Sequence, residues 1–194
     1  MPDYDLIVIG SSWGGLHAIE VVLSALPAGF ATPIAIAQHR AVDSGGGALS
    51  EMLAMRSGRE VRDAGDKDRI EKGGVYVAPP DYHLLVEPDG FALSTEGAVH
   101  HSRPSIDVLF DSAADVYADR LIGVILTGAN DDGAHGLMRV RRRGGLAIAQ
   151  DPSTAARPEM PAAAIATGAV QHVLPLEEIG PYLGHVARGE RAPA

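Results

Sequence analysis

The chain has 194 residues, of which 46% are hydrophobic and 21% charged, and its formal net charge is −9 at pH 7. The length predicts a single domain, since domains average about 150 residues, and the composition excludes wholesale disorder. The acidic balance argues against a surface that neutralises phosphates, so we expect no nucleic-acid partner. The absence of cysteine excludes disulfides, a thiolate nucleophile and a cysteine-based zinc site.

The N-terminus lacks the features of a targeting segment. Residues 1–5 are acidic where a signal peptide is basic, and the apolar run at residues 6–9 is too short for an export segment or a membrane span. We therefore expect a cytoplasmic protein without membrane insertion. We also expect residues 1–187 to form one domain and residues 188–194 to be a frayed tail.

The first elements are predicted to be a strand, a tight loop, a helix and a second strand. A β-branched run at residues 6–9 ends at Gly10, and apolar residues follow at helical spacing over residues 16–26. A second apolar run, residues 33–37, leads directly into residues 38–40, which read Gln-His-Arg. This order predicts a βαβ unit with parallel strands.

The middle of the chain has a different pattern of polar, apolar and turn residues. Residues 61–68 are polar, and two short apolar runs at 74–77 and 83–86 are separated by Pro- and Asp-containing turns at 79–81 and 88–90. We expect an antiparallel β insert in this region.

The second half returns to alternating helices and strands. We expect helices from Ser105 and over residues 133–143, 161–167 and 176–185, and strands over residues 120–126, 146–149 and 170–174. Helices that alternate with parallel strands predict an α/β fold.

Residues with catalytic side chains follow three of the expected parallel strands. These are Ser11-Ser12, His39 and Asp131-Asp132. In open α/β sheets, ligand sites lie beyond the carboxyl ends of the strands, so these loops can converge. Together they would supply a Ser-His-Asp triad, in which serine attacks, imidazole carries the proton and the carboxylate orients the imidazole. Each residue alone would suit a structural role, and their joint occurrence favours catalysis.

The loop GSSWGG at residues 10–15 places Ser12 in the G-x-S-x-G pattern of a strand-to-helix nucleophile turn. The loop also opens a helix, whose first N–H groups lack intrahelical partners. We expect the backbone N–H of Trp13, supported by Gly14, to stabilise an oxyanion.

The same glycine-rich loop leaves a nucleotide-binding alternative open. A Rossmann-like module would use Gly10, Gly14 and Gly15, but it favours an acidic residue at the end of the second strand. That position holds Gln38-His39. This disfavours the nucleotide hypothesis without removing it.

Several spaced motifs together resemble the catalytic domain of the CheB-type chemotaxis protein-glutamate methylesterase family, which also deamidates receptor glutamines. The resemblance covers about residues 4–183. The matching stretches are IVIGSSWGG, AIAQH, AGDKDRIEKGGVYVAPPDYH, RPSIDVLFDS, GVILTGANDDGAHGL and AQDPSTAARPEMPAAAIATGAV.

The resemblance implies Ser12 as nucleophile, His39 as general base and acid, and Asp132, which directly precedes a glycine, as the orienting carboxylate in place of Asp131. It implies a doubly wound, mainly parallel sheet flanked by helices, with a small antiparallel β-hairpin insert. The implied reaction is hydrolysis of a glutamate γ-methyl ester with release of methanol, without a metal or organic cofactor. The order Ser, His, Asp along the chain differs from that of α/β-hydrolases.

The implied partner is the methylated cytoplasmic region of a chemoreceptor-like protein. Well-known family members carry an N-terminal receiver domain, whereas this chain begins near the first catalytic strand, so we expect a stand-alone domain. A separate receiver or methyltransferase protein is a further candidate partner.

Departures from the family pattern bear on the substrate. Arg40, Ala129, Asn130 and Met160 are candidate substrate contacts, and Trp13 replaces a small residue. A non-catalytic signalling scaffold that uses Trp13 and Arg40 for partner contact is a further alternative. We expect the adjacent histidines 100–101 to be solvated rather than metal ligands, since no third ligand stands at a recognisable spacing.

Overall fold

A seven-stranded parallel sheet is the centre of the fold. The structure is a computed structural model and describes residues 4–40 and 45–187, so the predicted frayed tail lies outside the described residues. The strands are β1 (Leu6–Ser11), β2 (Ile34–Gln38), β3 (Val61–Asp63), β4 (Val75–Val77), β7 (Leu121–Ile125), β8 (Leu146–Gln150) and β9 (His172–Leu174). Their spatial order is β3-β4-β2-β1-β7-β8-β9. Every neighbouring pair is parallel.

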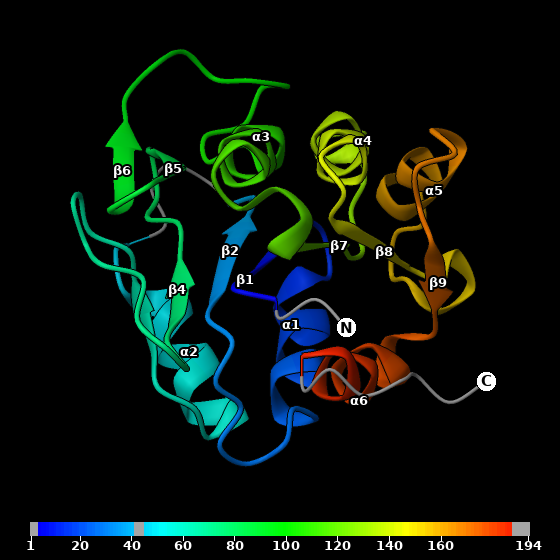
Figure 1. Ribbon diagram of the computed structural model, residues 1–194, viewed down its shortest axis with the longest axis horizontal. Helices are drawn as coiled ribbons and strands as arrows, with labels where there is room; N and C mark the ends of the chain where they lie inside the picture. The colour runs from blue at the N-terminus through cyan, green and yellow to red at the C-terminus, as the bar shows by residue number, and fades with distance from the viewer. Residues whose placement is uncertain (1–3, 41–44, 188–194) are drawn as a thin grey trace.

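Helices cover both faces of the sheet (Figure 1). On one face lie α1 (Gly15–Ser24), α2 (Ala48–Ser57) and α6 (Leu176–Val186), and on the other α3 (Ile106–Tyr117), α4 (Ala134–Arg142) and α5 (Glu159–Ala166). Short 3₁₀ turns at Ala118–Arg120 and Pro152–Thr154 complete the helical segments. None of the helices in the described ranges is long and apolar enough to cross a membrane.

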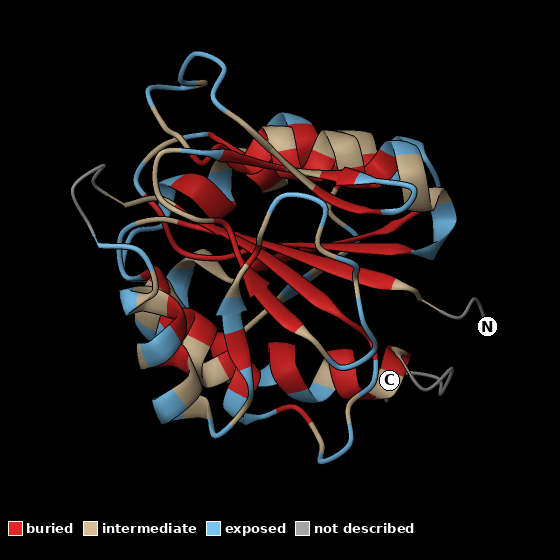
Figure 2. Cartoon of the chain, turned by 90° about the vertical axis from the view of Figure 1, so that its left-hand side faces the viewer, coloured by how far each residue is buried: buried red, intermediate tan, exposed pale blue. Residues whose placement is uncertain are grey.

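The inner strands β1, β2, β4, β7 and β8 are buried along their whole length because helices cover both faces of the sheet. In β1, Leu6 and Val8 belong to the core beneath α3 and α4, whereas Ile7 and Ile9 belong to the core on the α1 side. Figure 2 shows the buried strands between the two helical layers. Parallel sheets covered on both faces require such continuous apolar runs. The prediction of a doubly wound α/β fold is therefore confirmed.

The winding reverses at β1, and this reversal positions the site. The chain leaves β1 through α1 on one face to reach β2, and it enters β7, on the other side of β1, after α3 on the opposite face. Ser11 pairs with Gln38, and Gly10 pairs with Ile125. The carboxyl ends of β1, β2 and β7 therefore lie side by side, which is where open α/β sheets bind ligands.

The antiparallel insert is smaller than the sequence analysis predicts. It consists only of the hairpin β5 (His83–Glu87) and β6 (Gly90–Ser94). The run at 74–77 instead contributes β4 to the main sheet, where Val75 pairs in parallel with both Ile34 and Val61. Residues 61–63, part of the polar stretch for which no strand was predicted, form the edge strand β3.

The helix α2 was not predicted. Of its ten residues only Ser50 and Leu53 are buried, so its sequence shows no apolar stripe at helical spacing. Its helical state depends on packing against α1 and β3, a case in which tertiary contacts override a weak local signal.

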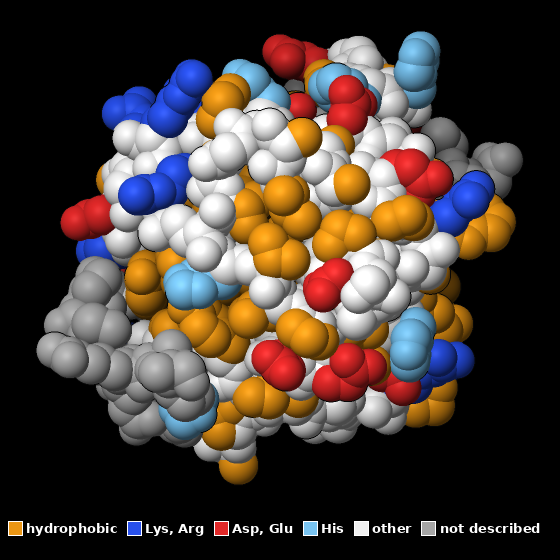
Figure 3. Space-filling view, turned by 90° about the vertical axis from the view of Figure 1, so that its right-hand side faces the viewer, with side chains coloured by type: hydrophobic (Ala, Val, Ile, Leu, Met, Phe, Trp, Pro, Cys, Tyr) orange, Lys and Arg blue, Asp and Glu red, His pale blue; other side chains and the backbone are white. Residues whose placement is uncertain are grey.

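The β9 edge of the sheet faces the viewer in Figure 3, where hydrophobic side chains gather among Asp and Glu side chains. Strand β9 has three residues, and Val173 is 44% exposed. A short edge strand offers few unpaired backbone groups to another chain, which limits edge-to-edge association.

Close packing of α6 against α1 gives a stability prediction. A Cβ at Gly180 would lie 2.6 Å from the backbone oxygen of Val22 and 2.8 Å from Ala25 Cβ. Gly180→Ala should therefore lower the free energy of unfolding by about 1–2 kcal/mol, since overpacking outweighs the gain of about 1 kcal/mol in helix propensity. Urea denaturation measures the change. Gly97→Ala, where the Cβ would meet open space, serves as the control and should stay within about 0.5 kcal/mol of the parent.

Candidate active site

Ser12 lies in a tight turn between β1 and α1. Its backbone N–H donates to the Thr127 carbonyl at 2.9 Å, and its own carbonyl accepts from the Gly15 N–H at 2.9 Å. Gly14 has a φ of 80°, a left-handed conformation that glycine adopts at low cost. The turn therefore anchors the Ser12 backbone to the loop after β7 while leaving its side chain half-exposed.

Gln38 joins the serine loop to the histidine loop. Its Oε1 accepts from Ser11 Oγ at 2.5 Å, and its Nε2 donates to the carbonyls of Ser12 and His39, both at 2.8 Å. A Cβ at residue 15 would lie 1.9 Å from Gln38 Oε1, so glycine is required there. Both ends of the Gln38 amide are thus engaged within the protein, which removes this side chain from the ribose-binding role that a nucleotide module needs.

His39 pairs with Asp132 through Nε2. The Nε2–Oδ2 distance is 2.7 Å, and the two side chains are 9% and 0% exposed. An ionised carboxylate only accepts hydrogen bonds, so Nε2 carries the proton and Nδ1 retains its lone pair. The free nitrogen of His39 is therefore Nδ1, and it is the atom that can accept a proton.

Asp132 is buried at the N-terminus of α3, where every neighbour donates to it. Ser105 Oγ donates to Oδ1 at 3.0 Å, and the backbone N–H groups of Ile106 and Asp107 donate to Oδ2 at 2.8 Å and to Oδ1 at 3.0 Å. Burial by itself would raise the pKa of Asp132, but the hydrogen bonds from His39 and the two backbone N–H groups bring this pKa below its ordinary value. The carboxylate is therefore ionised and fixed.

Asp107 makes the reciprocal contact at the start of α4. Its Oδ1 accepts from the N–H groups of Gly133 and Gly136 at 3.0 and 2.6 Å. Burial raises the pKa of Asp107, and the nearby charge of Asp132 adds to this, while the Gly136 hydrogen bond opposes it. Asp107, in the first turn of α3, thus stabilises the start of α4, and Asp132, just before α4, stabilises the start of α3. Neither Ser105 nor Asp107 was assigned to the site from sequence, although the Ser-x-Asp helix start was visible.

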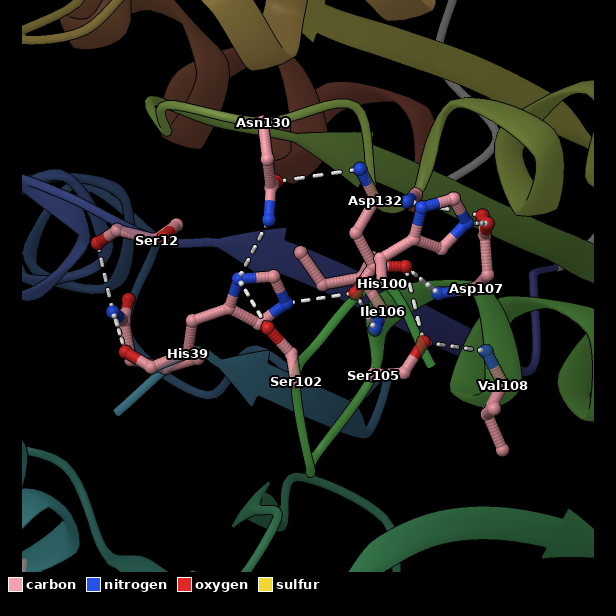
Figure 4. Close-up of polar contacts among 12 residues, drawn as sticks. Ser12, His39, His100, Ser102, Ser105, Ile106, Asp107, Val108, Asn130 and Asp132 are labelled. Atoms are coloured by element: carbon pink, nitrogen blue, oxygen red, sulfur yellow. Dashed lines mark hydrogen bonds and ion pairs between the residues drawn. The ribbon is translucent and has the colours of Figure 1, made fainter. Parts of the chain in front are cut away.

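Two polar side chains contact Nδ1 of His39. Ser102 Oγ lies 3.3 Å and Asn130 Nδ2 lies 3.4 Å from Nδ1. Figure 4 shows Ser12 on the Nδ1 side of the ring and Asp132 on the Nε2 side. Within the described residues, the Ser12 hydroxyl makes no hydrogen bond, so attack requires it to replace the present partners of Nδ1. Loose alignment of this kind is common in ligand-free triads. Ser102 was missed from sequence because it lies in a loop without a motif.

The expected oxyanion donors lie next to the nucleophile. In the part of the chain that the structure describes, neither the Trp13 nor the Gly14 N–H donates a hydrogen bond, and both precede the first turn of α1. Thr127 holds the loop in place. Its hydroxyl donates to the Trp13 carbonyl at 2.9 Å and accepts from the Arg157 N–H at 2.9 Å. These N–H groups are thus available to a ligand.

The four candidate substrate contacts have different surroundings. Ala129 is exposed and Asn130 half-buried in the loop after β7. Arg40 donates to the Ala78 carbonyl at 2.5 Å, and burial lowers the pKa of its guanidinium. Met160 is fully buried, and a Cβ at Gly128 would lie 2.5 Å from its Cε. Met160 therefore supports the loop after β7 from inside instead of facing a substrate.

The side chains of a cluster that could hold a metal ion already contact other groups of the protein. His100, Asp107 and Asp132 each offer an atom within 4.8 Å of the others. Both oxygens of Asp132 already accept hydrogen bonds. His100 instead faces carboxylate oxygens of Asp107 and Asp131 at 3.4 and 3.5 Å. The cluster therefore fits a hydrogen-bonded network better than a metal centre.

Comparison with known proteins gives one consistent result. The family model described as CheB methylesterase matches residues 7–183. The chain is similar to the crystal structure of the Thermotoga maritima CheB methylesterase catalytic domain, with a TM-score of 0.88 and 33% sequence identity, covering 94% of this chain and 98% of that one.

Curated relatives differ in how much of their own length matches this chain. A Leptospira interrogans protein with the provisional name protein-glutamate methylesterase/protein-glutamine glutaminase is 49% identical, over 91% of this chain and 92% of its own length. The protein-glutamate methylesterase FrzG of Myxococcus xanthus is 41% identical over 94% of this chain, which spans 54% of that protein. The similarity thus covers a whole relative in one case and about half in the other.

The two aspartates should differ in their effect on stability. Asp132→Asn places an amide N–H₂ among groups that all donate, so the free energy of unfolding at pH 7 should fall by about 2–4 kcal/mol. Asp107→Asn keeps an acceptor for the two glycine N–H groups and removes a charge that burial disfavours, so it should cost about 1 kcal/mol. Denaturant titrations of both variants measure the difference.

The pH dependence supplies the control. Because the pKa of folded Asp132 is lowered, its stabilisation is complete above the ordinary value of 3.8 and is lost as the pH falls through the lower folded pKa. The advantage of the parent over Asp132→Asn should shrink in that acid range. An advantage that grows on acidification would contradict the assignment of an ionised Asp132.

Proposed function

The chain belongs to the CheB methylesterase family, and we propose that it is a serine hydrolase that removes methyl groups from glutamate γ-methyl esters of chemoreceptor-type signalling proteins. The observation that carries this proposal is the His39–Asp132 pair, which leaves the proton-accepting Nδ1 on the side where Ser12 lies. That is the arrangement a serine nucleophile needs.

The reaction proposed for these residues has two halves. Ser12 Oγ attacks the ester carbonyl carbon and gives its proton to His39 Nδ1, while the N–H groups of Trp13 and Gly14 stabilise the oxyanion. Nδ1–H then protonates the methoxy oxygen, the C–O bond breaks and methanol leaves. Water repeats the sequence on the acyl-enzyme and releases a glutamate carboxylate and free Ser12. Asp132 stabilises the imidazolium in both halves.

An apolar cavity beside the triad is our candidate binding region for the substrate. It has a volume of about 250 Å³ and is lined by Leu16, Gln38, His39, Arg40, Gly45, Ala48, Leu49 and Met52. Trp13, with 69% of its surface exposed, borders the nucleophile. A methylated side chain presented from a protein surface would place its aliphatic part here, beside Arg40. Ala129, exposed in the loop after β7, is a further candidate contact.

The proposed setting follows from the proposed substrate. The methylated cytoplasmic region of a chemoreceptor-like protein would place the reaction in the cytoplasm, and a separate receiver or methyltransferase protein would be a further partner. The names of the relatives support a protein substrate with a glutamate methyl ester, since they pair protein-glutamate methylesterase with protein-glutamine glutaminase.

Two alternatives are less favoured. A nucleotide-binding module lacks its acidic ribose ligand, and Gln38 at that position is engaged by Ser11 and two backbone carbonyls. A non-catalytic scaffold would use Asp132 for its contacts with the start of α3, but it would have no use for a histidine whose Nδ1 faces a serine. The CheB family match covers the loops of all three residues.

Removal of the nucleophile is the direct test. Ser12→Ala should lower methanol release from a methylated receptor cytoplasmic fragment by about 10³-fold or more, because neither the attacking oxygen nor the acyl-enzyme remains. Radiolabelled methyl groups allow the methanol to be counted. A fluorophosphonate should label the parent protein at Ser12.

Ser57→Ala is the matched control, because Ser57 bonds only within and beside α2, through Leu53 and Arg59. This variant should keep parental activity and labelling. Full methanol release by Ser12→Ala would refute the proposed nucleophile. A parent protein that is folded but neither labelled nor active would favour the scaffold alternative.

A further inference from the structure

The side chain of Asn130 has a fixed orientation beside the proton-carrying nitrogen. Its Oδ1 accepts from the Asp132 N–H at 3.3 Å, so the opposite end of the amide, Nδ2, is the end that faces His39 Nδ1 at 3.4 Å. Figure 4 shows this nitrogen pointing toward the ring on the side where Ser12 lies. The group next to Nδ1 is therefore a donor whose direction the backbone of its own loop determines.

Proton transfer from Ser12 uses the lone pair of His39 Nδ1, which is the acceptor that Asn130 Nδ2 faces. Once Nδ1 has taken the proton of Ser12, it donates in its turn, and the Asn130 N–H faces another N–H. The Ser102 hydroxyl, 3.3 Å from the same nitrogen, differs because it can donate to neutral His39 and accept from the protonated ring. At this stage Asn130 needs a new acceptor, and the leaving group approaching Nδ1 is the candidate.

We propose that Asn130 selects esters over amides by donating a hydrogen bond to the leaving group. A methoxy oxygen has two lone pairs, so it can take the proton from Nδ1 and still accept from Asn130 Nδ2. The nitrogen leaving from a glutamine side chain has one lone pair, which the proton from Nδ1 consumes. The resulting –NH₃⁺ can only donate, and the Asn130 N–H then opposes it.

This inference rests on the proposed function and specifies its chemistry further. Breakage of the C–O bond releases methanol with the hydrogen bond from Asn130 in place, and breakage of the C–N bond releases ammonia without it. Both reactions use the same Ser12, His39 and Asp132. Asn130 thus changes the ratio of the two reactions, not the ability to perform either of them.

The test compares methanol and ammonia release by the same protein. The substrates are two receptor cytoplasmic fragments that differ at one position, which holds either a glutamate γ-methyl ester or glutamine. Asn130→Ala should lower kcat/KM for the ester about tenfold relative to that for the amide, since one hydrogen bond is lost in one transition state only. Asn130→Asp keeps an acceptor for the Asp132 N–H but turns the donor into an acceptor, so the ratio should fall further.

Ser102→Ala is the matched control, because it removes the other side chain that contacts Nδ1. Its hydroxyl can both donate and accept, so it does not distinguish an oxygen from a nitrogen leaving group. Both rates should therefore change together, and the ratio should equal that of the parent. An equal loss of both activities in the Asn130 variants would mean that Asn130 only positions His39, and this would overturn the proposal. A ratio shift in Ser102→Ala as large as in Asn130→Ala would overturn it as well.

Failure of the proposed function gives a different result. A parent protein that releases no methanol refutes both the esterase and the role of Asn130, whereas methanol release with an unchanged ratio in the variants refutes the role of Asn130 alone. If the parent releases no measurable ammonia, the proposal requires ammonia to appear with Asn130→Asp. Its continued absence would count against the proposal. Circular dichroism and thermal melts verify that each variant is folded.

Discussion

The site depends on two reciprocal contacts between α3 and α4, in which a carboxylate from each segment accepts hydrogen bonds from the start of the other helix. Asp132, at the start of the α4 segment, accepts from the first N–H groups of α3, and Asp107, in the first turn of α3, accepts from N–H groups that start α4. A buried carboxylate is costly unless donors surround it, and the N-terminus of a helix supplies both N–H groups and a favourable dipole. The pair therefore fixes two helices and produces an ionised aspartate at the end of β7.

The sheet topology decides which nitrogen of His39 becomes the base. Ser12 and His39 follow neighbouring strands that are in register, with the His39 N–H bonded to the Ser11 carbonyl. Nδ1 is the ring nitrogen closer to the backbone of His39, so it is the one that stays near the serine loop. Asp132 comes from β7, on the other side of β1, and meets the far nitrogen, Nε2. The protonation pattern of the triad is thus a consequence of strand order.

Sequence reasoning recovered the parts of the molecule that local patterns encode. Continuous apolar runs indicated the strands, and strand ends indicated Ser11-Ser12, His39 and Asp131-Asp132 as site candidates. Local patterns do not encode the contacts between loops. Gln38 could be recognised as an unsuitable ribose ligand, but its link between two loops depends on the close approach of Gly15, at a distance of 23 residues along the chain. The place of the short strands β3 and β4 in the sheet also depends on contacts that local patterns do not encode, since β4 pairs with β2 and β3 pairs with β4.

The distribution of satisfied polar groups shows where the chemistry can take place. The oxygens of Asp132 and both ends of the Gln38 amide are fully engaged, so these side chains hold the loops and have no capacity left for a ligand. The groups still open beside the nucleophile include the Ser12 hydroxyl and the N–H groups of Trp13 and Gly14 at the start of α1. Ser12 lies on the Nδ1 side of the His39 ring, and Trp13 and Gly14 follow it directly in the chain. A substrate carbonyl that satisfies these donors also meets the nucleophile, because one turn of the backbone carries all three groups.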